Sequence, residues 1–290
     1  MWTRALPPLL LLTVAGCGGS AGNNQASPFP EPHRPVAPVS SRYLNEDQRE
    51  RVGEFATVSG LAEVRERMFV ADIGAGGGYY TVRLAPLVGS KGRVLAEDII
   101  PETIRALGQR IQRERLDNVA IRLGQPNNPQ LPAGSLDRIF MIHMYHEIER
   151  PSEFLWNMRA SLKSDGRVIV VDADRPTTQH GTPQRLLVCE FNAVGYALTR
   201  FERLPDSESY FAQFEPRGPR PEPARFPPAI PDSGLERRPE PAISISCRPI
   251  SSSCAGSSTR GSARPTGPAR ARSRCSATRC ASICRRASPC

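Results

Sequence analysis

The sequence predicts an α/β domain built on a doubly wound, mostly parallel seven-stranded sheet that ends in an antiparallel hairpin. Short apolar runs alternate with amphipathic stretches between residues 68 and 172, as in proteins whose helices cover both faces of a sheet. A glycine-rich turn follows the first of these runs. Two extended runs, 197–204 and 210–214, come last and are expected to pair with each other.

Each element is expected from its own local pattern. Apolar residues spaced among charges over 45–66 predict one or two helices ahead of the first strand. Pro101 is placed to begin a helix, and Ser164 to Gly166 are expected to end another in a turn. The five parallel strands are expected at 68–73, 93–99, 119–123, 137–142 and 167–172. The helices between and after them are expected at 80–88, 101–116, 151–162 and 186–196.

Residues 70–78, Val-Ala-Asp-Ile-Gly-Ala-Gly-Gly-Gly, carry most of the functional information. Glycine lacks a Cβ, so this loop can adopt positive φ and bring its backbone close to a ligand. The following helix offers its free N–H groups to the same ligand. Asp98 ends the next apolar run, where nucleotide-binding α/β folds bind ribose hydroxyls. The sequence therefore predicts a cofactor that contains a nucleoside.

The loop does not fit the dinucleotide fingerprint, because Tyr79 occupies the position of its third glycine. With Asp72 before the loop and Asp98 after it, residues 45–215 resemble the class I S-adenosylmethionine-dependent methyltransferases. They are most similar to the small-molecule type that includes the quinone-biosynthesis C-methyltransferases. The resemblance implies a Rossmann-like methyltransferase fold with S-adenosyl-L-methionine as cofactor. A nicotinamide oxidoreductase and a glycine turn without a ligand are the alternatives.

The resemblance also implies which residues contact the cofactor. Asp72 and the loop would lie beside its methionine part, and Asp98 would bind the ribose. Tyr79 and Tyr80 are expected to close over the methionine end, with packing against the sheet as the alternative for either. Asn127 stands where related enzymes often place an acid for the adenine amino group, so its amide oxygen is a weaker acceptor. The cofactor-binding residues expected are Asp72, Gly74, Ala75, Gly76, Gly78, Tyr80, Asp98, Ile99, Asn127 and His143.

Catalytic residues are expected in His143-Met-Tyr-His-Glu147, which follows the fourth parallel strand. His146 is the candidate general base, with Glu147 or Tyr145 orienting it. The alternative is that His143 and His146 cap the strand and bond to the backbone. No catalytic base is then needed, because a sulfonium methyl donor is already activated and can react by positioning alone. No Asn-Pro-Pro-aromatic motif is present, which favours a small-molecule carbon or oxygen acceptor over an amino group.

The charge and the cysteines separate a neutral body from a basic tail. The formal net charge is +9, but residues 241–290 hold nine arginines without Lys, Asp or Glu. The remaining chain is balanced, so no nucleic-acid partner is expected for the folded part. No metal site is expected either, because the cysteine spacing matches no zinc pattern.

The first 17 residues predict a lipoprotein signal peptide. A basic start, an apolar stretch too short to span a bilayer, and Val14-Ala-Gly-Cys17 resemble the bacterial lipoprotein cleavage site. The resemblance implies a lipid on Cys17 that attaches the protein to a membrane in the cell envelope, facing the periplasm. Gly18 favours the outer membrane. An ordinary signal peptide is the alternative. Residues 18–44 are expected to be a flexible tether.

Residues 216–290, rich in proline, arginine, serine and cysteine, predict a disordered tail. The composition from about Arg225 onward is typical of an out-of-frame reading of a GC-rich gene, and a cysteine-rich binding tail is the alternative. The envelope location favours a second hypothesis for the whole protein, because S-adenosylmethionine is made in the cytoplasm. In that hypothesis the protein is a non-catalytic envelope lipoprotein that keeps the methyltransferase fold.

Overall fold

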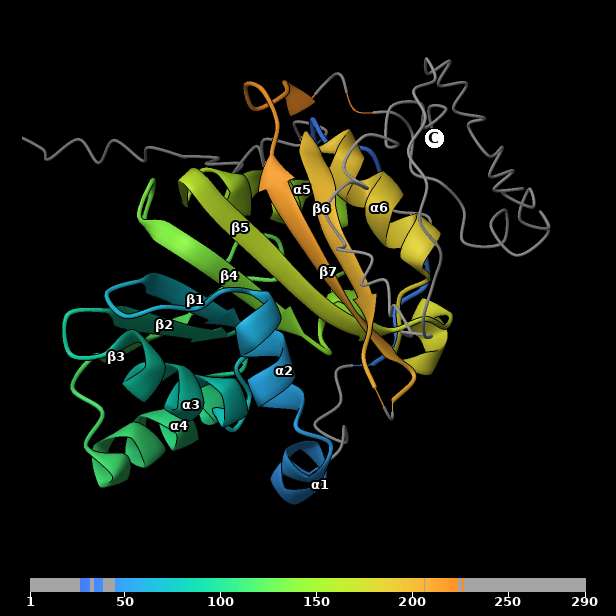
Figure 1. Cartoon of the computed structure of the whole chain (residues 1–290). Coiled ribbons are helices and arrows are strands. Elements are labelled where there is room, and N and C mark those ends of the chain that lie inside the picture. The colour runs from blue at the N-terminus through green and yellow to red at the C-terminus, as the bar shows by residue number, and fades with distance from the viewer. Residues whose placement is uncertain (1–26, 32–33, 39–44, 206, 224–225, 227–290) are drawn as a thin grey trace, which may run out of the picture.

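The computed structural model describes residues 27–31, 34–38, 45–205, 207–223 and 226. Within them, one seven-stranded sheet runs in the order β3-β2-β1-β4-β5-β7-β6 (Figure 1). The first five strands pair in parallel, while β7 lies antiparallel between β5 and β6. The predicted fold class is confirmed, including the closing hairpin.

The elements follow the predicted order along the chain. The strands are β1 (Phe69–Ile73), β2 (Arg93–Asp98), β3 (Val119–Leu123), β4 (Leu136–Ile142), β5 (Leu162–Ala173), β6 (Tyr196–Arg203) and β7 (Ser209–Pro216). The α-helices are α1 (Glu46–Arg51), α2 (Glu54–Leu61), α3 (Tyr79–Val88), α4 (Pro101–Glu114), α5 (Pro151–Arg159) and α6 (Gln184–Ala193). Two short 3-10 helices, η1 (Tyr145–Glu147) and η2 (Thr177–Gln179), follow β4 and β5.

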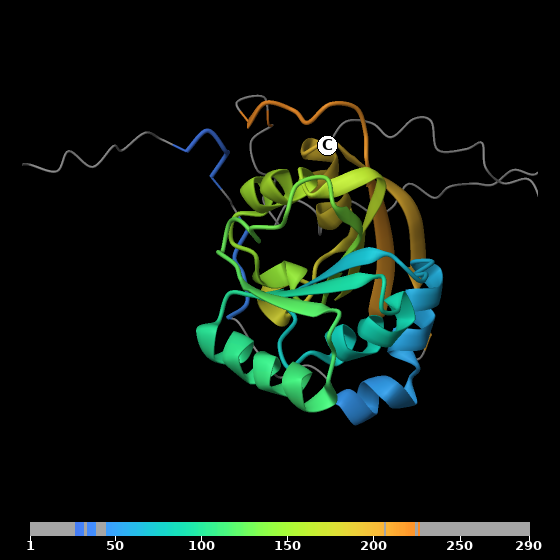
Figure 2. The ribbon, with the colours of Figure 1, turned by 90° about the vertical axis from the view of Figure 1, so that its left-hand side faces the viewer.

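Helices cover both faces of the sheet (Figure 2). Successive side chains of the central strand β5 pack in turn into the hydrophobic core on one face and the core on the other. In β5, Val168 and Val170 pack with residues of α5 and α6, while Ile169 and Val171 pack with residues of α2 and α3. All four side chains are fully buried. This two-residue period is what a central strand covered on both faces requires.

Strand β5 begins earlier than predicted. Ser164 to Gly166 were expected as a turn, but they belong to β5, which starts at Leu162. A register shift between Leu136 and Arg138 lets Leu162 pair with Leu136. A Cβ at Gly166 would stand only 2.7 Å from the carbonyl oxygen of Leu136, so glycine allows the two strands to approach.

Part of the predicted tether is packed against the domain. Arg34 and Ala37 are buried, with 7% and 2% of their surface exposed. Arg34 donates hydrogen bonds to the carbonyl oxygens of Tyr145 and Ile148 at 3.0 and 2.9 Å. The expectation of a free tether is therefore wrong for this stretch, because buried carbonyl groups at η1 accept from the guanidinium group.

The other predictions for the two ends of the chain concern residues outside the described ones. These are the signal peptide, Cys17 with its lipid, and the tail beyond residue 226. Among the described residues, every helix is too short or too polar to cross a bilayer.

Candidate functional site

A cavity of about 600 Å³ opens at the carboxyl ends of β1, β2 and β4. Ligands of open α/β sheets bind at this edge, beside the strand from which the chain order reverses. Here the order reverses at β1, whose neighbours are β2 and β4. The cavity is lined by the glycine loop, the end of β2, the segment after β4, and residues of α1. Its volume lies in the range of small-molecule sites.

The glycine loop forms one wall of the cavity. Gly74, Gly76 and Gly78 have φ values of 65°, 53° and 88°, which L-residues with a Cβ rarely adopt. A Cβ at Gly78 would stand 2.4 Å from Cδ1 of Leu107 in α4. Gly78 therefore allows α3 and α4 to pack, while Gly74, Ala75 and Gly76 line the cavity.

Asp98 fixes the loop to the start of α4. Its carboxylate accepts from the backbone N–H of Gly76 at 3.0 Å and from that of Ile100 at 2.9 Å. Asp98 also lines the cavity, together with Ile99. The structure thus places both predicted residues in the wall of the cavity.

Glu97 was not predicted, although it lines the same cavity. Its side chain is buried, and burial raises its pKa to about 8, with Asp98 and Asp72 adding to the effect. Within the described residues, its Oε1 atom has no hydrogen-bond partner. The available signal in the sequence was that Glu97 directly precedes Asp98 at the end of a predicted strand, whereas its burial depends on the tertiary structure.

Two predicted cofactor contacts lie beneath the loop instead of in the cavity lining. Tyr80 is buried in the core, where its hydroxyl donates to Glu54 at 3.2 Å. Asp72 accepts from the hydroxyl of Thr81 at 2.6 Å, and burial raises its pKa to about 6. Tyr79, which begins α3, lines the cavity in place of Tyr80. Tyr80 instead packs against Phe55 of α2 and Phe140 of β4, because the start of α3 lies on that face of the sheet.

His143 comes directly after β4 and lines the cavity. Its φ of 55° turns the chain sharply into the segment that carries His146. The ring contacts Glu54 through Nε2 at 3.1 Å. Burial lowers the pKa of His143, and this effect outweighs the rise in pKa that Glu54 favours.

Asn127 lies beside the cavity, and its neighbour Pro126 lines it. The Asn127 side chain donates to Glu153 at 2.7 Å, and its backbone carbonyl accepts from Asn157. The segment is therefore anchored to α5. Asn127 stays a prediction as a cofactor contact.

His146 is buried and held through one ring nitrogen. Its Nδ1 lies 3.0 Å from Oδ1 and 3.1 Å from Oδ2 of Asp172, at the end of β5. Asp172 also accepts from the hydroxyl of Thr182 at 2.8 Å. Because the carboxylate accepts, Nδ1 carries the hydrogen and Nε2 keeps its lone pair. Nε2 of His146 lies 3.9 Å from Oε1 of Glu147.

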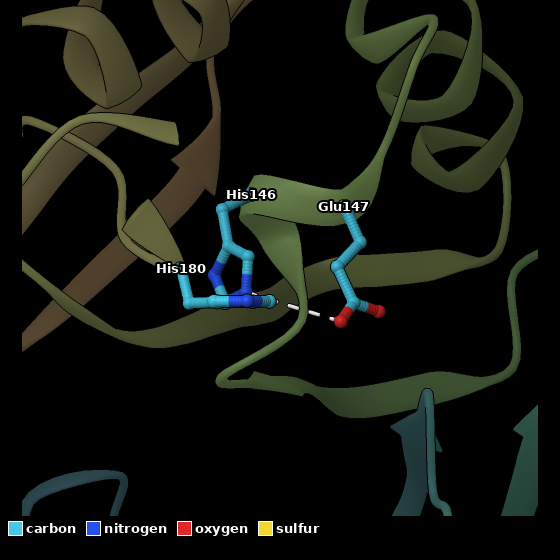
Figure 3. Close-up of side chains that lie close together, drawn as sticks. All are labelled: His146, Glu147 and His180. Atoms are coloured by element: carbon cyan, nitrogen blue, oxygen red, sulfur yellow. Dashed lines mark ion pairs between the residues drawn. The ribbon is translucent and has the colours of Figure 1, made fainter. Parts of the chain in front are cut away.

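His180 joins His146 and Glu147 in one cluster, drawn in Figure 3. The rings of His146 and His180 meet edge to face, with their centroids 5.5 Å apart. Local sequence patterns did not predict that His180 would lie beside His146. The available signal was topological, because the ends of the adjacent parallel strands β4 and β5 lie at the same edge of the sheet.

Comparisons with known proteins agree with this geometry. A family model described as "Methyltransferase domain" matches residues 65–199. A protein-L-isoaspartate O-methyltransferase from Methanothrix thermoacetophila is 28% identical over 150 residues, which cover 49% of this chain and 65% of the relative. The chain spans less than two thirds of the length of the curated relatives it matches.

Solved structures show the fold. A SAM-dependent methyltransferase from Aquifex aeolicus superposes with a TM-score of 0.53 at 21% identity, covering 59% of this chain and 98% of its own. The [4+2]-cyclase SpnF superposes with the same TM-score at 12% identity, covering 66% and 89%. Residues 65–199 thus match a methyltransferase domain in sequence and have the class I methyltransferase fold, and the cofactor of that family is S-adenosylmethionine, as predicted. Similarity to quinone C-methyltransferases stays a prediction.

Proposed function

We propose that the protein transfers the methyl group of S-adenosylmethionine to a small-molecule acceptor at the Met144–Glu147 end of the cavity. The observation that carries this proposal is the position of Asp98. Its carboxylate joins Gly76 to the start of α4 at the cavity wall. A carboxylate in this place accepts hydrogen bonds from the two ribose hydroxyls of a nucleoside.

The acceptor end is assigned from the part of the cavity that the cofactor leaves. A Cβ at Gly74 would contact Met144 at 3.0 Å, so Met144 borders the loop where the methionine part of the cofactor would end. Glu147 lines the cavity three residues later. An acceptor held between them would approach the methyl group from the side of η1.

The chemical step needs orientation more than acid–base catalysis. A lone pair of the acceptor attacks the methyl carbon, and the new bond forms as the carbon–sulfur bond breaks. The sulfur keeps the electron pair of that bond, which leaves neutral S-adenosylhomocysteine. A proton on the acceptor leaves to His146, Glu147 or water. Positioning of the two reactants supplies most of the acceleration.

We favour an oxygen acceptor over a carbon acceptor. The curated relatives are named as O-methyltransferases, which supports transfer to oxygen. The cavity volume of about 600 Å³ supports a small molecule, because cofactor and acceptor must share it.

Two alternatives make different predictions. A nicotinamide oxidoreductase needs a close approach at the third glycine position, but Tyr79 stands there with the guanidinium groups of Arg49 and Arg83 on its ring, at 4.0 and 3.9 Å. A non-catalytic envelope protein with the same fold would fold normally and bind no S-adenosylmethionine. The cyclase SpnF illustrates that this fold alone does not fix the reaction.

Titration calorimetry on the full chain tests the cofactor assignment. We expect S-adenosylmethionine and S-adenosylhomocysteine to bind, and NADH not to bind. Asp98→Ala should weaken binding at least about tenfold, because hydrogen bonds to a charged group contribute about 1.5–3 kcal/mol. Asp117→Ala is the control, since Asp117 is an exposed acid before β3. Equal binding by both variants would refute the site.

The cellular location is a separate proposal. We propose that a lipid on Cys17 attaches the protein to the outer membrane, with the domain facing the periplasm. The basic start, the apolar stretch and the small residues before Cys17 support it. Cys17→Ser should abolish incorporation of a labelled fatty acid and release the protein from the membrane fraction. Unchanged labelling of that variant would refute the proposal.

A further inference from the structure

We propose that His146, Glu147 and His180 bind one divalent first-row transition metal ion beside the acceptor end of the cavity. Each of the three side chains offers one ligand atom, and these atoms all lie within 4.8 Å of one another. Figure 3 shows the two imidazole rings and the carboxylate converging on one space, from η1 and from the segment after η2.

The ligand set selects the class of ion. Two imidazoles and one carboxylate are the donors of catalytic Zn²⁺ sites and of Fe²⁺ sites with open positions, whereas Mg²⁺ and Ca²⁺ prefer oxygen donors alone. Zinc–ligand bonds measure about 2.0–2.2 Å, so ligand atoms around one ion stand about 3–3.5 Å apart. The present ligand atoms lie within 4.8 Å of one another, so binding of an ion would draw them closer together.

Asp172 supplies the outer contact that metal-binding histidines commonly have. It accepts from Nδ1 of His146, and its own oxygens are further held by the Thr182 hydroxyl and the backbone N–H of Ala173, at 2.8 and 2.9 Å. This arrangement fixes the ring and leaves Nε2 as the donor atom. A carboxylate–histidine–metal arrangement of this kind orients the ring and raises its basicity.

The second histidine is held from its backbone and leaves its ring available. His180 directly follows η2 with a φ of 56°, and its carbonyl oxygen accepts from the side chain of Arg175 at 3.4 Å. Within the described residues, its imidazole nitrogens make no hydrogen bond. The segment 34–38 also holds η2, because the carbonyl oxygen of Pro35 accepts from the Thr177 hydroxyl at 2.5 Å.

The position of the ion beside the cavity gives it a role in methyl transfer, and this role rests on the proposed function. Glu147 lines the cofactor cavity, so an ion bound to it would face the acceptor. Three protein ligands leave coordination positions for an acceptor oxygen. A bound divalent ion lowers the pKa of such a hydroxyl and orients it toward the methyl group. The inference therefore favours an oxygen acceptor, with Nε2 of His146 as a ligand rather than a proton acceptor.

The test measures metal content of the full chain, independently of turnover. The protein is dialysed against a chelator, loaded with Zn²⁺, dialysed again and analysed for zinc by mass spectrometry. We expect His180→Asn and Glu147→Gln each to retain less zinc than the unmodified protein, by about one ion per chain. Asparagine suits position 180 because it tolerates positive φ.

His143→Asn is the matched control, because its ring contacts Glu54 instead of the cluster. It should retain zinc at the level of the unmodified protein. Loading with Co²⁺ should give visible absorption bands that His180→Asn lacks. Circular dichroism checks that each variant is folded.

Equal zinc in His180→Asn and the unmodified protein would overturn the proposal, as would a folded unmodified protein without zinc. Calorimetry with S-adenosylmethionine separates this inference from the proposed function. Zinc bound without cofactor affinity would support the metal site and refute the methyltransferase assignment. Cofactor affinity without bound zinc would support the methyltransferase assignment and refute the metal site.

Discussion

Glu54 and His143 form a buried contact of 3.1 Å that joins α2 to the end of β4. Burial alone would raise the pKa of Glu54, but His143 and Arg49 lower it to about 2. The carboxylate is therefore ionised at neutral pH, so Nε2 of His143 carries the hydrogen. Tyr80 donates to the same carboxylate. One acid thus orients a cavity histidine, an α1 arginine and a tyrosine beneath the glycine loop.

Glu54→Gln should destabilise the protein by about 3–5 kcal/mol at pH 7, because it removes the charge from an ion pair whose two side chains, Arg49 and Glu54, are only 13% and 5% exposed. The pKa of Glu54 is lowered from about 4.5 in the unfolded chain to about 2 in the folded protein. Its ionised carboxylate therefore stabilises the folded protein fully above pH 4.5, and this stabilisation is lost as the pH falls toward 2. Denaturant unfolding should show the difference at pH 7 and a smaller one at pH 3. Glu66→Gln, at an exposed acid, should change little. A difference that grows on acidification would contradict this account.

Glu97→Gln should remove a pH dependence of stability. Glu97 has a folded pKa of about 8 against about 4.5 for the unfolded chain, because it is buried. The folded state therefore keeps its proton between these values while the unfolded state loses it, and the free energy of unfolding falls as the pH rises through this window. The loss is on the order of a few kcal/mol. Thermal unfolding from pH 5 to 8 should be flatter for Glu97→Gln. The exposed Glu102→Gln should keep the original slope.

Two glycines of the loop should respond differently to alanine. Gly78→Ala places a Cβ 2.4 Å from Leu107 at a φ of 88°, so we expect a loss of about 1–3 kcal/mol in stability. At Gly76 the nearest atom to such a Cβ is 4.0 Å away, in a loop that lines the cavity. Gly76→Ala should therefore lose less stability and more S-adenosylmethionine affinity. Urea unfolding and calorimetry compare the two, and the reverse order would disprove the assignment.

Asp172→Asn should weaken zinc binding without removing a ligand. In the unmodified protein, His146 and Thr182 both donate to the carboxylate of Asp172. The amide of asparagine offers only one acceptor oxygen to these two donors. Loss of such an outer partner costs about 10–100-fold in metal affinity. Competition with a zinc-binding dye measures the effect. Unchanged zinc affinity in a folded Asp172→Asn variant would mean that His146 does not bind the ion.

Arg34→Met should loosen the segment that carries the cluster. The guanidinium group donates to the carbonyls of Tyr145 and Ile148, and it lies 3.4 Å from Glu190. Methionine keeps the apolar stem and leaves these acceptors unpaired, at a cost of about 1.5–3 kcal/mol in stability. Thermal unfolding should show it, and proteolysis near η1 should become faster. Arg65→Met, at an exposed arginine, serves as the control. Equal stability of both variants would show that the buried contact is dispensable.

Local sequence patterns determined the elements and the cofactor end of the site. Short apolar runs placed the parallel strands, because strands that are covered on both faces are apolar at successive positions. The loop from Gly74 to Gly78 and the acid at Asp98 predicted the cavity wall, because backbone freedom and charge are properties of single residues. Asp98, Ile99 and His143 all line the cavity that this reasoning predicted.

The tertiary structure alone decided which distant groups meet and which are buried. His180 lies beside His146 because β4 and β5 are neighbours in the sheet. Glu97 becomes a weak acid, and Arg34 is buried against η1, only once other segments cover them. Local propensity carries no term for such contacts, since their free energy depends on burial and on partners far away in the chain.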